Sequence, residues 1–168
     1  MSRNETAPYE VLKKEGSFEI RKYDTFFTVT AKESEIGETM GFNQLFSYIS
    51  GENATHETIA MTVPVLNDLS EDHRTTEFVM PERFTKEGPL SPLNPGLGVH
   101  KYEKCLMASI SFSGSIDAER IRSHKNQLVE WLATTEWEPT GRFLLARYNS
   151  PFSLPVFRTN EVLAVLKR

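Results

Sequence analysis

Apolar side chains recur at spacings of three and four residues between Gly41 and Ile49. Phe42, Leu45 and Phe46 lie on one face of a helix with this period, whereas the polar side chains between them fall on other faces. A glycine, the residue favoured just beyond the end of a helix, follows at position 51. The pattern predicts a helix that packs through an apolar face and ends near that glycine.

A different period follows from Ile59 to Val65, where an apolar residue occupies every second position. This alternation is typical of a strand with one buried face. Pro64 has no backbone N–H to donate to a neighbouring strand, so we expect this strand to lie at a sheet edge or to contain a bulge.

The same succession of patterns occurs again in the second half of the chain. The segment around Tyr23 aligns with the segment around Tyr102, and an apolar strand follows each of them, at 26–31 and at 106–112. A helix follows in both halves, and Asp117 is a suitable N-cap for the second one. The apolar face of that second helix carries Ile121, Leu128, Trp131 and Leu132.

Two strands follow each helix, at 59–66 and 76–80 in the first half and at 141–148 and 161–167 in the second. A duplicated strand-helix-strand-strand unit predicts an α+β fold, a distorted antiparallel β-barrel flanked by two helices. The pseudo-repeats cover approximately 9–80 and 99–168, and a loop rich in proline and glycine joins them at 81–98. Neither unit closes a barrel alone, so we expect residues 1–168 to form a single domain.

Composition narrows the class of protein. The chain has 168 residues, 39% of them apolar, which is enough for one core. It contains no apolar run of the roughly 20 residues that a membrane span needs and no apolar leader, so we expect a cytoplasmic protein. Its net charge of −4 argues against a nucleic-acid partner. Cys105 is the single cysteine, which excludes an intramolecular disulfide.

Several short motifs, in this order along the chain, resemble the SOUL family of haem-binding proteins. They are Tyr9-Glu10-Val11-Leu12, Phe18-Glu19-Ile20-Arg21-Lys22-Tyr23, Gly41-Phe42 through Asn53, Met61-Thr62-Val63-Pro64-Val65, Phe78-Val79-Met80-Pro81, Phe112-Ser113-Gly114, Tyr148-Asn149-Ser150-Pro151 and Arg158-Thr159-Asn160-Glu161-Val162. The resemblance covers nearly the full length, and it implies the same helix-flanked barrel. It also implies that the protein binds haem or another tetrapyrrole, as a carrier or a buffer.

The resemblance places the ligand in a hydrophobic cleft between the first helix and the loop before the last strand. The residues at the corresponding positions here are Phe42, Phe46 and Ser47 on the helix and Phe152, Leu154, Val156 and Phe157 in the loop. Two aromatic residues at helical spacing are also common in a protein core, so Phe42 and Phe46 have a purely structural alternative. The loop residues lie between Pro151 and Pro155 and are more typical of a wall or a lid.

The sequence departs from the family pattern at the groups that would hold a haem most tightly. The segment 36–49 contains no lysine or arginine, and Lys22 stands where some members have a candidate histidine ligand. Lys22 and Arg158 are then the remaining cations for the propionates, and His56 is a weak candidate for an axial ligand. No two histidines have metal-ligand spacing, so we expect no structural zinc site. We therefore expect binding mostly without strong axial ligation.

Two other functions remain open. The same cleft could serve an effector-type binder of other amphipathic small molecules. A small hydrolase is the minority alternative, since the chain has neither a Gly-x-Ser-x-Gly elbow nor a glycine-rich phosphate loop. Glu19, Arg21 and Tyr23 share one face of a strand and could meet Glu161 and Arg158, but we interpret them as surface ion pairing.

Overall fold

The computed structural model describes residues 5–33, 40–72, 74–149 and 159–168. Its helices are α1 (Met40–Ile49), α2 (Ala118–Leu132) and the short 3₁₀ helix η1 (Glu82–Phe84). The strands are β1 (Tyr9–Glu15), β2 (Phe18–Tyr23), β3 (Phe26–Lys32), β4 (Val65–Asp68), β5 (Thr75–Val79), β6 (Leu97–Tyr102), β7 (Leu106–Ser113), β8 (Pro139–Arg147) and β9 (Thr159–Leu166). None of the helices among these residues is long and apolar enough to cross a membrane.

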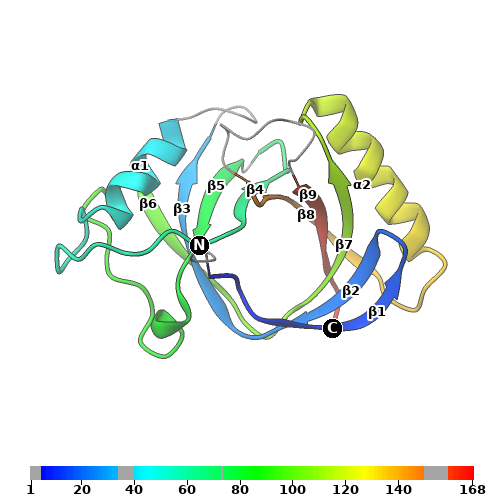
Figure 1. Cartoon of the computed structure of the whole chain (residues 1–168), viewed down its shortest axis with the longest axis horizontal. Coiled ribbons are helices and arrows are strands. Elements are labelled where there is room, and N and C mark those ends of the chain that lie inside the picture. Colours follow the sequence, from blue (N-terminus) through cyan, green and yellow to red (C-terminus); the bar gives the residue numbers. More distant parts are fainter. Residues whose placement is uncertain (1–4, 34–39, 73, 150–158) are drawn as a thin grey trace.

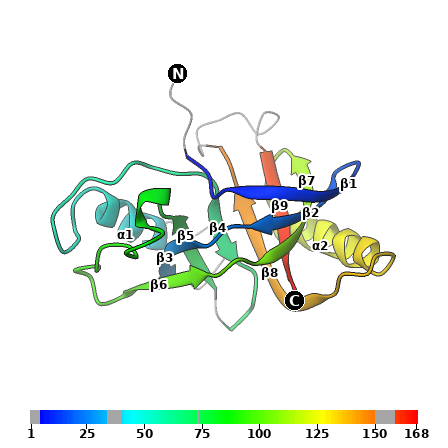
Figure 2. The same cartoon turned by 90° about the horizontal axis from the view of Figure 1, so that it is seen from below.

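The nine described strands form one sheet in the order β1-β2-β7-β9-β8-β4-β5-β3-β6. All pairings between these strands are antiparallel, and the sheet curls into an incomplete barrel (Figure 1). The helices α1 and α2 lie outside it, at opposite ends of the long dimension (Figure 2). The predicted α+β fold with a distorted barrel and two flanking helices is therefore confirmed.

Strand alternation sends side chains to the convex face, under the helices, or to the concave face. On the convex face, α1 packs Leu45, Tyr48 and Ile49 against β3 and β5. The helix α2 packs Leu128 and Leu132 against β7, β8 and β9. A third apolar cluster fills the concave face, and it includes Tyr23, Phe26, Leu66, Tyr102, Met107, Leu144 and Leu163. The sheet is therefore buried on both faces.

Both predicted helix boundaries agree with the described structure. The helix α1 ends at Ile49, and Gly51 adopts a φ of +129°, a conformation that residues other than glycine rarely adopt. Asp117 caps α2, because its side chain accepts a hydrogen bond of 2.9 Å from the backbone N–H of Arg120. The order strand, strand, helix, strand, strand occurs twice along the chain, while the duplication itself stays a prediction.

The predicted strand at 59–66 is wrong over most of its length. Only Val65 and Leu66 belong to a strand, β4, which continues to Asp68. Earlier in this segment the backbone bonds to scattered partners rather than to one strand: Ile59 N–H donates to Ile49 at 2.7 Å, and Val63 N–H donates to Glu5 at 3.0 Å. The alternation of apolar and polar residues here reflects an extended chain that buries one side. The chain does not form the regular hydrogen bonds of a strand with a neighbouring strand.

The connection over 81–98 packs against the rest of the fold at two points. Phe84 is buried beside α1, and the Tyr48 hydroxyl donates a hydrogen bond of 2.5 Å to the carbonyl of Leu90. The connection is therefore fastened to the same helix that carries the predicted ligand-binding residues.

Candidate functional site

The outer surface of α1 presents two aromatic rings that the sequence predicted for the ligand site. Phe46 is 52% exposed, whereas Phe42 is half-buried. Their rings are nearly parallel, with centroids 6.4 Å apart, and the Phe42 ring meets Phe78 of β5 edge-on at 5.2 Å. Phe42 thus belongs partly to the core, while Phe46 offers an aromatic face to solvent.

A shallow depression of about 540 Å³ lies beside Phe46. Its lining residues are Phe46, Ser47, Ser50, Gly51, Glu52 and His56. The structure thus brings together Phe46, Ser47 and His56, which lie within eleven sequence positions but on two different elements. The volume falls within the 300–1,000 Å³ typical of small-molecule sites, and the depression is open to solvent.

Asn53 organises the turn that places His56 at the rim of this depression. The buried Asn53 amide donates to the carbonyls of Tyr48 at 2.9 Å and Glu57 at 2.8 Å. Its own carbonyl oxygen accepts from the Glu57 N–H at 3.1 Å. His56 has a φ of +55° within this turn, so its exposed imidazole is held on a fixed backbone.

The residues around the depression suit the aromatic ring of a tetrapyrrole better than they suit its negatively charged propionates. Phe46 can stack on a macrocycle, and His56 supplies the imidazole that could face a metal. The described lining contains no lysine or arginine, and Glu52 adds a carboxylate. No group of three metal-ligating side chains gathers anywhere in the described ranges. The depression therefore suits stacking and leaves the propionates to be met elsewhere.

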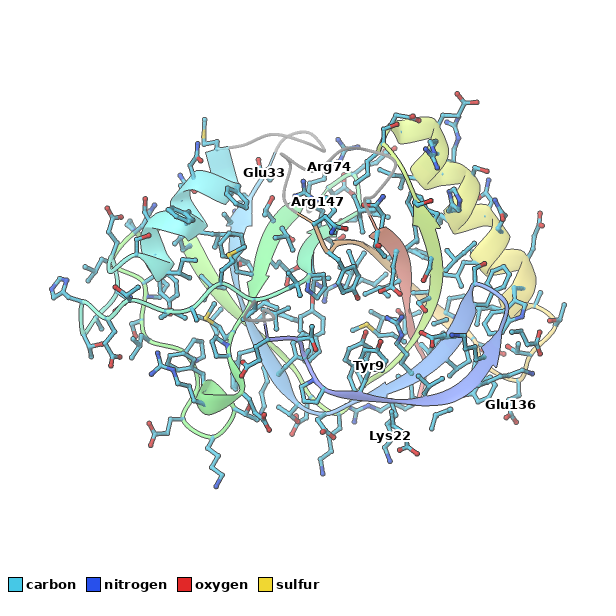
Figure 3. All side chains as sticks on the ribbon, viewed as in Figure 1. Tyr9, Lys22, Glu33, Arg74, Glu136 and Arg147 are labelled. Atoms are coloured by element: carbon cyan, nitrogen blue, oxygen red, sulfur yellow. The ribbon has the colours of Figure 1, made fainter. Side chains whose placement is uncertain are left out.

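Lys22 does not lie beside α1. It is exposed on β2, whereas α1 packs on β3 and β5, and Figure 3 shows it at the lower edge pointing away from the helix. The other residues predicted for the site are Phe152, Leu154, Val156, Phe157 and Arg158, and all five lie outside the described residues.

Three of the residues that we interpreted as surface ion pairing, Arg21, Tyr23 and Glu161, are instead buried on the concave face. Arg21 and Glu161 have side chains that are only 3% and 5% exposed, and Arg21 Nη1 donates to Glu161 Oε1 at 2.9 Å. The same guanidinium also pairs with Glu19 at 2.7 Å. The interpretation was wrong because strand alternation gives the shared face but not whether that face is enclosed.

Neighbouring hydroxyl groups complete the hydrogen bonding of the Glu161 carboxylate. Tyr148 donates to Oε1 at 2.5 Å, and Ser111 donates to Oε2 at 3.1 Å. Burial alone would lower the pKa of Arg21, but the hydrogen bond from Arg21 to Glu161 and the surrounding acidic groups raise it, so Arg21 stays charged. Burial also raises the pKa of Tyr23 and Tyr148. We therefore describe this cluster as an ion pair enclosed by neutral tyrosines.

A small cavity of about 70 Å³ adjoins this cluster. Its walls are mostly apolar and include Tyr9, Tyr23, Phe26, Leu66, Met107 and Tyr148. This volume is far below the 300–1,000 Å³ of typical small-molecule sites, so the cavity is too small for a tetrapyrrole.

A second buried carboxylate lies on the concave face in the other half of the sheet. Glu77 accepts hydrogen bonds from Thr28 at 2.7 Å and from Tyr102 at 3.0 Å, and Arg142 lies 3.5 Å from it. Arg142 also pairs with Asp68 at 3.1 Å. Glu77, Asp68 and Arg142 were not predicted, because each of them resembles an ordinary surface charge in the sequence.

His100, on β6, also lies on this concave face, where its ring contacts Tyr102. Its Nε2 is 3.3 Å from Arg142 Nη1. A guanidinium can only donate, so His100 must accept through Nε2 as a neutral imidazole. Burial lowers the pKa of His100, and the charge of Arg142 lowers it further. His100 is therefore held in its neutral form.

Arg147, at the end of β8, is a further residue that the sequence did not single out. Its partner in register is Val65, which packs with α1, so Arg147 faces the convex side. Figure 3 shows it between the two helices, near Glu33 and Arg74. It takes part in none of the salt bridges found among the described residues, and its Nε is buried with no hydrogen-bond partner.

Solved structures similar to this chain share its fold at low sequence identity. The EcmrR C-terminal domain matches with a TM-score of 0.61 and 8% identity, over 95% of this chain and 98% of that one. A protein described as a hydrolase from Listeria innocua matches with a TM-score of 0.60 and 8% identity, over 93% and 94% of the two chains. An uncharacterised conserved protein from Listeria innocua has a TM-score of 0.56 and 13% identity, over 86% and 88%.

These likenesses support the fold and carry no function, because the identities are so low. Among curated proteins, no sequence matches the chain. The family model described as SOUL heme-binding protein, in contrast, matches residues 4–165, which is nearly the whole length. With the helix-flanked curled sheet and the exposed aromatic face of α1 in place, the chain belongs to the SOUL haem-binding protein family.

Proposed function

We propose that this protein is an intracellular carrier or buffer of haem or a related tetrapyrrole, which it binds mostly without strong axial ligation. The observation that carries the proposal is the Phe46 ring, 52% exposed on α1 and flanked by a depression of about 540 Å³. An exposed aromatic ring beside a hollow surface offers a flat apolar face on which a conjugated ligand can stack.

The membership of the family supports the ligand class, and the local chemistry supports the mode of binding. Phe46, backed by Phe42, would hold the macrocycle by stacking, while Ser47 offers a hydroxyl at the same surface. The bound group would supply the iron or the conjugated ring, and His56 is the described imidazole nearest to it. Because His56 stands on an exposed turn, it would compete with water for the metal.

A titration with haemin, followed by its Soret band, tests the proposal when metal-free mesoporphyrin is titrated beside it. We expect micromolar affinities that differ by no more than about tenfold, roughly 1.4 kcal/mol, since the metal contributes little. The Phe46→Ala substitution should weaken the binding of both ligands. Val129→Ala, which trims an exposed apolar side chain on α2, is the matched control and should bind as the wild type does.

Two results would contradict this proposal. One is a sharp six-coordinate Soret spectrum that is lost in His56→Ala, which would establish strong axial ligation. The other is an unchanged affinity for both porphyrins in Phe46→Ala, which would remove α1 from the site.

The cavity on the concave face supports a second candidate function, in which the protein binds another amphipathic small molecule as an effector. This cavity places three tyrosines next to the buried Arg21 and Glu161 pair, and Tyr9 at its wall is 40% exposed. Truncating Tyr9 to alanine would enlarge the opening. If the neutral probe Nile red then binds more tightly without displacing mesoporphyrin, the protein has a separate concave site. Competition between the two probes would assign both to α1.

A further inference from the structure

We propose that Arg147 binds a carboxylate of the tetrapyrrole and so replaces the basic side chains that α1 lacks. This inference rests on the proposed function and names the cation that the ligand's propionates would meet. It begins from the state of the Arg147 side chain, whose burial lowers its pKa while the Glu33 carboxylate offsets only part of that effect.

A guanidinium that is largely buried without an ion pair is unusual, because desolvating a charge costs free energy unless a partner compensates. Of the described carboxylates, Glu33 is the one that acts on Arg147, and it lies outside salt-bridge distance. Glu33 is also committed elsewhere: it accepts from Thr76 at 2.9 Å and lies against Gly41 in the first turn of α1. Arg147 therefore has bonding capacity that these neighbours do not use.

A second unpartnered atom lies on the same face. Asn67 is 4% exposed, and its amide nitrogen donates to Thr76 at 3.0 Å, but its Oδ1 has no hydrogen-bond partner. Val65 pairs with Arg147 in register, so Asn67, two residues further along β4, is a diagonal neighbour of Arg147. Buried polar atoms without partners are rare in native structures, and a bound molecule is one way in which they are satisfied.

The sheet register connects Arg147 to the aromatic side of α1. One row of convex-face residues crosses five adjacent strands, in the order Phe78, Val65, Arg147, Asn160 and Phe112. Phe42 packs on Phe78 at one end of the row, which is two strands, or roughly 10 Å, from Arg147. A tetrapyrrole that lies against Phe42 and Phe46 is wide enough to extend a propionate over Arg147.

Two porphyrins of similar shape but different charge can show whether Arg147 recognises the carboxylates of the ligand. Mesoporphyrin carries two carboxylates, and its dimethyl ester carries none. In Arg147→Gln, we expect the affinity for mesoporphyrin to fall by about tenfold or more, as for loss of a charge-assisted hydrogen bond, while the affinity for the ester stays unchanged. Arg122→Gln, which removes an exposed arginine from α2, is the matched control and should change neither affinity.

A stability measurement without ligand gives an independent readout. Because Arg147 lacks a counterion, Arg147→Met should raise the Tm of the ligand-free protein by about 2–4 °C. Mesoporphyrin should raise the Tm of the wild type more than that of Arg147→Met. The inference would be overturned if Arg147→Met had a lower Tm than the wild type and if Arg147→Gln bound mesoporphyrin as tightly as the wild type does. These results would show that a bound water satisfies the guanidinium. They would leave the proposed tetrapyrrole function intact.

The outcomes also separate this inference from the proposal beneath it. If the wild type binds neither mesoporphyrin nor its ester, the tetrapyrrole function fails and the role of Arg147 fails with it. If the wild type binds both and Arg147→Gln loses them equally, the substitution has changed the fold of the site, and carboxylate recognition by Arg147 is refuted.

Discussion

Arg21 and Glu161 lie 140 residues apart in the sequence and form a buried ion pair on the concave face of the sheet. The pair joins β2 to β9, two strands that are not adjacent because β7 lies between them. The ion pair therefore holds β2 and β9 together across β7, which favours the curved shape of the sheet, and each charge also gains a buried partner.

Removing one partner of this pair should be strongly destabilising. Arg21→Met leaves the Glu161 carboxylate buried without its cation, and we expect a loss of about 3–5 kcal/mol in the free energy of unfolding at neutral pH. The double variant Arg21→Met/Glu161→Gln should recover part of that loss, because Glu161 no longer carries a charge and only the less buried Glu19 is left without its cation. Urea unfolding of the four proteins in the cycle measures the coupling, and purely additive losses would contradict it.

The neutral state of His100 predicts a dependence of stability on pH. Its folded-state pKa is lowered by burial and by Arg142, so the unfolded chain binds the proton more readily. The stabilisation is present above the unfolded value of about 6.5 and is lost as the pH falls through the lower folded value. The acidic groups that face His100, Glu77 and Asp68, oppose this effect without reversing it.

Urea midpoints measured between pH 7.5 and pH 5 test this expectation. The wild type should lose stability over that range, and His100→Gln should lose distinctly less. Equal slopes for the two proteins would show that His100 is not the group responsible.

The two aromatic residues of α1 should differ in their cost to stability. Phe46→Ala should lower the free energy of unfolding by no more than about 1 kcal/mol, because most of that ring is exposed. Phe42→Ala should cost about 2 kcal/mol, less than the 3–5 kcal/mol of a fully buried phenylalanine, since half-buried Phe42 still contacts Phe78. Chemical denaturation compares them, and equal costs would mean that Phe46 also belongs to the core.

The hydrogen bond between Tyr48 and Leu90 should hold the connection 81–98 to α1. Burial raises the pKa of Tyr48 to about 12, so its hydroxyl remains a donor at neutral pH. Tyr48→Phe should cost about 1 kcal/mol and leave the Leu90 carbonyl without that donor. Amide hydrogen exchange within 84–97 should accelerate in this variant. Tyr9→Phe is the control, because no hydrogen bond joins the Tyr9 hydroxyl to another described residue, and similar exchange in both would contradict the assignment.

Periodicity was sufficient for the elements that pack by one face. The apolar spacing in α1 and α2 reports burial against a layer, which is a local property of the chain. It failed at 59–64, where extended chain also alternates but pairs with no single strand. Hydrogen-bond partners are not encoded in the period of side chains.

The site was less accessible to sequence reasoning than the fold. Phe46 and Ser47 could be named from the family resemblance, and His56 from its place in the loop after the helix, and the structure does gather them at one depression. Arg21 and Arg147 look alike in the sequence, since each is a basic residue in a strand. One is neutralised by a residue 140 positions away and the other has no ion pair within the described chain, a difference that only tertiary structure can reveal.

The position of β9 has a consequence for how the chain folds. This strand lies between β7 and β8, so without it the sheet divides into a three-stranded piece and a five-stranded piece. Every other described strand is synthesised before β9, and the pairs that join the halves close loops of great length. Folding should therefore be slow and governed by contact order, and a nascent chain should expose both unfinished sheet edges to chaperones until residues 159–166 emerge.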